Sequence, residues 1–84
     1  MGRAEFIILS VLKQNGATGR LSSMTLREIA GAEDLGMKEN TIFKKLKGFE
    51  VSGYIGRGLK EGRAATFFIT PEGIGALEKE RGTP

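Results

Sequence analysis

The sequence predicts an α+β domain in which three helices are followed by a two-stranded β-hairpin and a fourth helix. Apolar residues recur at helical spacing as far as residue 52, whereas beyond Gly53 they alternate with polar residues as they do in strands. A chain of 84 residues that is 39% apolar has enough material for one modest core. We therefore expect a single domain over residues 1–84, with disordered ends at residues 1–2 and 81–84.

The first helix is expected over residues 3–15, because Gly16 favours a helix end. Its inner stripe consists of Ala4, Ile8, Val11 and Leu12, with Leu9 at the edge. Phe6 is expected opposite this stripe and Ile7 beside it. Two apolar residues outside a core stripe indicate a second buried surface, so we expect a contact with another copy of the chain there.

The second helix is expected to begin at Thr25, because Thr25 and Glu28 have the spacing of a capping box. The loop before it, residues 17–23, leaves room for a short strand at residues 21–24. A turn at residues 35–37 follows, in which Gly36 supplies a backbone geometry that other residues resist. The third helix is expected over residues 38–52, ending at Gly53. Its buried stripe consists of Ile42, Leu46 and Phe49.

Two short strands, residues 54–59 and 65–69, are expected to pair across a polar turn as a β-hairpin. Gly56 and Gly58 allow two interpretations, close packing of the hairpin or a mobile hairpin. The inner face of the second strand consists of Ala65, Phe67 and Ile69. The last helix, residues 71–80, is expected to begin with Thr70 as its cap, and to turn Ile74 and Leu77 inward.

Several absences limit the chemistry open to this chain. It has no cysteine, which excludes disulfides and thiolate zinc sites, and no histidine, which removes the commonest general base and metal ligand. We therefore expect no catalytic residue, metal or cofactor, and no enzyme activity. No apolar run approaches the roughly 20 residues that a membrane span needs, so we expect no membrane partner.

The net charge of +3 indicates an anionic partner only weakly, but many of the basic residues fall between residues 38 and 63. A helix with a polar, basic face fits the DNA major groove, where Asn40 can pair with adenine, and Thr41 and Lys44 can reach bases or phosphates. A basic hairpin suits the adjacent minor groove or backbone. The candidate DNA-binding residues are Lys38, Asn40, Thr41, Lys44, Lys45, Lys47, Arg57, Lys60 and Arg63.

The alternative interpretation of these charges is a solvated surface with no partner. By itself the charge does not decide between the two. A helix face with few acids beside a basic hairpin favours phosphate neutralisation, with Glu39 as the exception, because its carboxylate repels phosphate unless it accepts from cytosine or pairs with a lysine.

Two segments resemble the MarR and PadR groups of winged helix-turn-helix regulators. Residues 35–42, followed by Leu46, Phe49 and residues 53–55, resemble the turn and recognition helix of that pattern, and residues 67–73 resemble the segment that closes its wing. The resemblance implies a winged helix-turn-helix fold, with a three-helix core, a two-stranded β-hairpin wing and a C-terminal helix, that reads DNA with residues 38–45 and the wing at residues 59–64. Lys38 replaces the usual Ser or Thr cap, and the long dimerisation helices of MarR proteins are missing.

These observations predict sequence-selective binding of double-stranded DNA by a small transcriptional regulator in the cytoplasm, associated with the nucleoid. The third helix would enter the major groove and the wing would lie on the adjacent backbone or minor groove. The alternative is a winged-helix protein-interaction module within a larger complex. A homodimer is expected, because two copies double the DNA site. Its contact would use the first and last helices, through Phe6, Ile7, Ile74 and Leu77.

Overall fold

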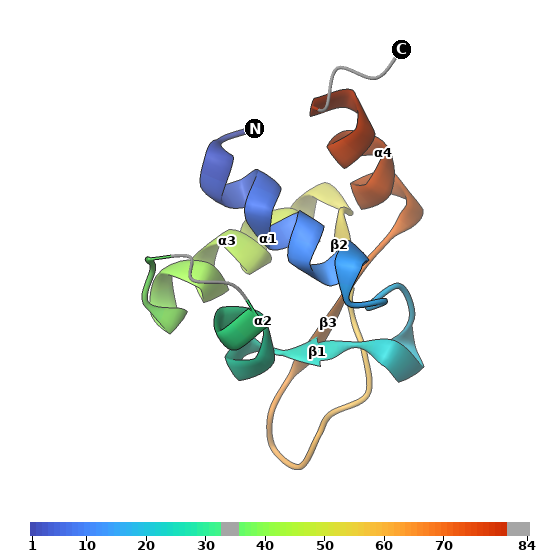
Figure 1. Ribbon diagram of the computed structural model, residues 1–84. Helices are drawn as coiled ribbons and strands as arrows, with labels where there is room; N and C mark the ends of the chain where they lie inside the picture. Colours follow the sequence, from blue (N-terminus) through green and yellow to red (C-terminus); the bar gives the residue numbers. More distant parts are fainter. Residues whose placement is uncertain (33–35, 81–84) are drawn as a thin grey trace.

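The computed structural model describes residues 1–32 and 36–80, and within these ranges the expected order of helices and hairpin is confirmed (Figure 1). The elements are α1 (Arg3–Gln14), the 3-10 turn η1 (Arg20–Ser22), β1 (Met24–Thr25), α2 (Leu26–Ala32), α3 (Glu39–Ser52), β2 (Ile55–Arg57), β3 (Thr66–Ile69) and α4 (Pro71–Glu80). Residues 33–35 and 81–84, which include part of the predicted turn and the expected loose end, lie outside the described residues.

The sheet has three antiparallel strands in the order β1-β3-β2. The prediction of a short strand at residues 21–24 was wrong in its position. Residues 20–22 form η1 instead, where the Ser23 hydroxyl donates to the Arg20 carbonyl oxygen at 3.0 Å, and the strand that pairs with β3 begins at Met24. In the hairpin itself Ile55 lies opposite Ile69, and Arg57 lies opposite Phe67.

The core lies between α1, α2, α3 and the inner face of the sheet. The predicted stripe of α3 is confirmed, because Ile42, Leu46 and Phe49 are all buried. The stripe of α1 needs a correction, since Leu9 is fully buried and Ala4 only half-buried. α1 contacts α2, β3 and α4, so these neighbours cover a wider arc of it than a single stripe.

The apolar residues assigned to a dimer contact are placed differently from the expectation. Phe6 does not project to solvent opposite the core; it is half-buried and packs against it, as do Ile7 and Ile74. Leu77 is only 3% exposed, because α4 buries it against the core of its own chain. Leu77 therefore cannot contribute to a contact with a second copy.

The local signals for helix ends are confirmed. The Glu28 carboxylate accepts from the Thr25 amide at 2.8 Å, and the Thr25 hydroxyl accepts from the Glu28 amide at 3.1 Å, which is a complete capping box. Gly53 ends α3 with φ of 80°, a left-handed conformation that favours glycine. The Thr70 hydroxyl accepts from the Gly73 amide at 3.1 Å and so caps α4. Among the residues described, no helix is long and apolar enough to cross a membrane.

The capping box is expected to stabilise the domain measurably. Thr25→Ala should lower the free energy of unfolding by about 1 kcal/mol, because it leaves an early amide of α2 without its acceptor. Thr25→Ser is the matched comparison, since serine and alanine at this position differ only in the hydroxyl. Urea unfolding of both variants measures the difference, and equal midpoints for the two would show that the cap contributes nothing.

Candidate nucleic-acid interface

The side of α3 that faces away from the core carries an exposed stripe of one amide, two lysines and one valine. Asn40, Lys44, Lys47 and Val51 follow one another at spacings of four, three and four residues, so they share one helix face. All four are exposed. We call these four residues the outer stripe. The opposite side of α3 is buried in the core, so the outer stripe faces solvent. Within the described residues, no member of the outer stripe takes part in an ion pair. Thr41 is exposed on the flank, and exposed Lys38 immediately precedes the helix.

The hairpin wing projects beyond β2 and β3 (Figure 1). Its tip is closed by a bridge between Glu61 and Ala64, with a tight turn at Gly62, which has φ of 63°. Lys60 and Arg63 are both exposed there. The tip is therefore a short, narrow loop that carries two free cations and one carboxylate, Glu61.

The base of the wing is closely packed, which decides between the two interpretations of its glycines. A Cβ on Gly58 would fall against the side chain of Ser23 and within 2.8 Å of the Arg20 carbonyl oxygen, and a Cβ on Gly56 would lie 2.7 Å from the ring of Phe68. The Leu59 amide also donates to the Arg20 carbonyl at 3.3 Å. These glycines thus allow close packing of the hairpin against η1 and its own second strand.

A hollow of about 440 Å³ separates the N-terminal half of α3 from the wing. Its lining includes three charged side chains, Arg27 from α2, Glu39 from α3 and Glu61 from the wing tip. Glu39 was the acid that the sequence singled out, and the structure places a second acid and a cation beside the same hollow. Sequence reasoning did not single out Arg27, because its place beside this hollow depends on how α2, α3 and the wing are arranged in the fold.

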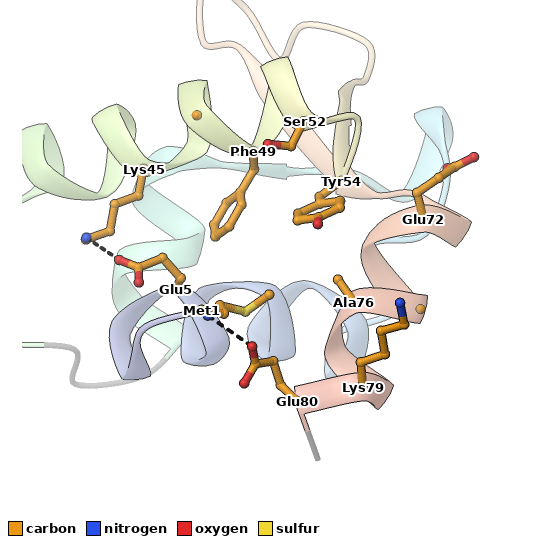
Figure 2. A pocket seen from close by; sticks show the side chains of 12 residues that line it. Met1, Glu5, Lys45, Phe49, Ser52, Tyr54, Glu72, Ala76, Lys79 and Glu80 are labelled. Carbon is orange, nitrogen blue, oxygen red and sulfur yellow. Dashed lines mark hydrogen bonds and ion pairs between the residues drawn. The ribbon is translucent and has the colours of Figure 1, made fainter. Parts of the chain in front are cut away.

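Lys45 lies on a different side of α3 from the outer stripe. It forms an ion pair with Glu5 of α1 and is half-buried (Figure 2). Both residues line a second hollow, of about 850 Å³, whose wall includes the neighbouring rings of Phe49 and Tyr54. Figure 2 shows this hollow between α1, α3 and α4, with the Met1 ammonium group donating to Glu80 at 3.0 Å. The structure therefore does not bring Lys45 together with the other candidate residues.

The pairing with Lys45 predicts a contribution to stability that depends on pH. The Lys45 ammonium group donates to Glu5 and lowers the pKa of that carboxyl below its ordinary value of 4.5, although burial opposes the shift. Because the pKa of this carboxyl is lower in the folded protein than in the unfolded one, its ionised form stabilises the fold at pH values above the unfolded-state pKa. This stabilisation is lost as the pH falls through the lowered, folded-state pKa. Glu5→Gln should therefore lessen the fall in unfolding free energy below about pH 4.5. Urea unfolding at a series of pH values checks this, and parallel curves for the two proteins would contradict it.

Arg57 is also engaged within the chain. Its guanidinium donates to both carboxylate oxygens of Glu50, at 3.0 and 3.2 Å, and lies over the ring of Phe67 at 4.8 Å. Lys47 behaves differently, because its ammonium group lies 5.5 Å from the ring centre of Phe43 while the side chain stays exposed. Among the candidate residues, the cations that are exposed and form no ion pair in the described part of the chain are thus Lys38, Lys44, Lys47, Lys60 and Arg63.

The described residues contain no group of three carboxylate, histidine or cysteine side chains that could hold a metal ion. What the site offers is instead an amide and cations along one helix face, with two more cations on a hairpin. Such a surface can bind phosphate through charge and base edges through hydrogen bonds.

Comparison with known proteins gives close relatives. The DNA-binding protein TubR of Clostridium botulinum C phage is 35% identical over 78 residues, which cover 93% of this chain and 94% of that protein. The solution structure of the DNA-binding TubR fragment from Clostridium botulinum has a TM-score of 0.73 at 32% identity, covering 94% of this chain and 95% of that one. TubR from Bacillus megaterium pBM400 has a TM-score of 0.80 at 21% identity, covering 95% and 86%. No family model matches the chain.

The resemblance to the MarR and PadR groups is confirmed at the level of the fold. A MarR-family transcriptional regulator from Silicibacter pomeroyi has a TM-score of 0.75 at 15% identity, covering 94% of this chain and 49% of that one. A PadR-family regulator from Clostridium difficile R20291 has a TM-score of 0.76 at 21% identity. The described residues therefore form a winged helix, which here consists of four helices and a three-stranded antiparallel sheet.

Proposed function

This chain belongs to the TubR family of DNA-binding proteins, and from that premise we propose that it binds double-stranded DNA with α3 and the wing. The outer stripe of α3 enters the major groove, while Lys60 and Arg63 lie on the adjacent backbone or minor groove. The observation that carries the proposal is the separation of the cations. Those of the outer stripe and the wing tip are exposed and form no ion pair within the described ranges, whereas Lys45 and Arg57 are held in ion pairs.

Base recognition falls to Asn40 and Lys44, which lie in the N-terminal half of α3. An Asn amide can pair with adenine, and a Lys ammonium with the acceptor edge of guanine. We assign phosphate contacts to the remaining candidates, because Thr41 is on the flank of α3, Lys38 precedes it and Lys47 lies farther along it. A small domain that binds a particular DNA sequence acts by occupying that DNA site. We therefore propose that the role of this chain is transcriptional regulation and that it acts in the cytoplasm.

The test is fluorescence anisotropy with a labelled random duplex of about 30 base pairs, titrated at several salt concentrations. Each phosphate neutralised contributes roughly −0.9 to the slope of log affinity against log salt, so about four contacts predict a slope of about −3.6. Binding that weakens this steeply supports the proposal. No binding at low salt would show that the charged face is only solvated, and would redirect the search to a protein partner.

We also propose a homodimer, because one short helix recognises few base pairs and two copies double the site. α1 and α4 contact each other and carry the half-buried apolar residues Phe6, Ile7 and Ile74, which supports a contact through these helices. Sedimentation equilibrium of the free protein and of its DNA complex tests this. A mass of one chain per duplex, even at high protein concentration, would contradict it.

A further inference from the structure

We propose that Glu50 and Arg57 are positioning residues that hold the wing at a fixed angle to α3, and that Arg57 does not itself bind DNA. We call this ion pair the wing latch. The effect of this ion pair on DNA affinity rests on the proposed function, because the angle between α3 and the wing matters only if DNA contacts both. The latch itself is a feature of the free protein.

The guanidinium of Arg57 is already engaged within its own chain. Its Nε donates to Glu50 Oε2 at 3.0 Å and its Nη2 to Oε1 at 3.2 Å, so two N–H groups on one edge are used. This paired arrangement is the stronger and more directional form of an Arg–carboxylate contact. The guanidinium carbon lies over the Phe67 ring, 4.8 Å from its centre. One edge of Arg57 is thus bound to Glu50, and the group also contacts Phe67.

The latch joins the two elements that would read DNA. Glu50 lies in the last turn of α3, and Arg57 is the last residue of β2, immediately before the wing leaves the sheet. On the other side of the wing base, Gly58 packs against η1 and the Leu59 amide donates to the Arg20 carbonyl. The wing base is thus fixed by η1 on one side and by α3 on the other, and the latch is its side-chain connection to α3.

The role of Glu50 can be decided by the sign of one measurement. A carboxylate close to bound DNA repels phosphate, so removing its charge should strengthen binding if it does nothing else. If Glu50 instead holds the wing through Arg57, removing its charge should weaken binding. Both side chains are a little over one-third exposed, at 37% and 38%, so solvent moderates the effect without removing it.

The experiment compares the DNA affinity of four proteins, each first checked for an unchanged thermal unfolding curve. Glu50→Gln should weaken binding about threefold to tenfold. Glu50→Asp, which keeps the charge but shortens the reach, should weaken it as well. Glu50→Arg combined with Arg57→Glu should recover most of the wild-type affinity. Glu78→Gln on α4 is the matched control and should not weaken binding.

A second measurement needs no DNA. In the free protein, hydrogen exchange at the Gly58 and Leu59 amides should become about threefold to tenfold faster in Glu50→Gln, because both amides bond at the wing base. Unchanged exchange would overturn the latch even if the protein failed to bind DNA. Tighter binding by Glu50→Gln would overturn it in the complex. So would an exchanged pair that binds DNA as weakly as Glu50→Gln does. Absence of salt-dependent binding by the wild type would contradict the proposed function alone.

Discussion

Gly73→Ala is expected to lower the free energy of unfolding by about 3 kcal/mol, which is a large share of the stability of so small a domain. Gly73 is buried in the first turn of α4, which packs here against Tyr54, just before β2, and against Ile69 at the end of β3. An added Cβ would fall against the Tyr54 carbonyl oxygen and lie 2.7 Å from Ile69 Cγ1. Backbone cannot give way as a flexible side chain can, so α4 must move off the sheet.

Thermal unfolding followed by circular dichroism measures this effect, and a midpoint lower by roughly 10–20 °C is expected. Gly75→Ala is the matched control. It lies two residues farther along the same helix, where an added Cβ meets nothing within 4 Å, so alanine's better helix propensity should make it neutral or stabilising. Equal effects of the two substitutions would show that close packing against Tyr54 and Ile69 does not limit position 73.

Replacing Lys44 and Lys47 together by alanine is expected to weaken DNA binding about 100-fold, roughly tenfold for each lysine. Both ammonium groups are exposed on the outer stripe and neither is paired with an acid among the described residues. Because the proposal assigns Lys47 to phosphate and Lys44 to a base edge, the slope of log affinity against log salt should become shallower by about 1. Anisotropy titrations at several salt concentrations give both quantities.

The matched control replaces Lys13 and Lys79, which are exposed at the ends of α1 and α4 and change the net charge by the same amount. This variant should lose little affinity, and its salt slope should stay close to that of the wild type. Similar losses in both variants would mean that overall charge, and not the outer stripe, carries binding. The assignment of the DNA-binding site to α3 would then be wrong, although the protein still bound DNA.

The helix ends that depend only on residues close together in the chain could be predicted from the sequence. Thr25 and Glu28 are three residues apart, and the capping box they form needs no other part of the chain. The same holds for Gly53 at the end of α3 and Thr70 at the start of α4. The short strand β1 was misplaced, because its pairing with β3 depends on residues more than 40 positions away.

The candidate site could be predicted only where exposure follows from helix periodicity. Asn40, Lys44 and Lys47 lie opposite a clear apolar stripe, so their exposure was visible in the sequence. Lys45 lies at the edge of that stripe, and its partner Glu5 is 40 residues away. Arg57 looked like a free cation because Glu50 comes beside it only when β2 turns back along α3. Tertiary pairing of charges leaves no local signal in a single sequence.

The most direct test of the DNA surface is a titration of isotopically labelled protein with a short duplex, followed by backbone amide chemical shifts. We expect the largest shifts on the outer stripe of α3, on Thr41 and on the wing tip at residues 60–63. We expect small shifts for Lys45, Glu5 and α4, which lie around the other hollow. Shifts concentrated on that hollow, with the outer stripe unchanged, would contradict it.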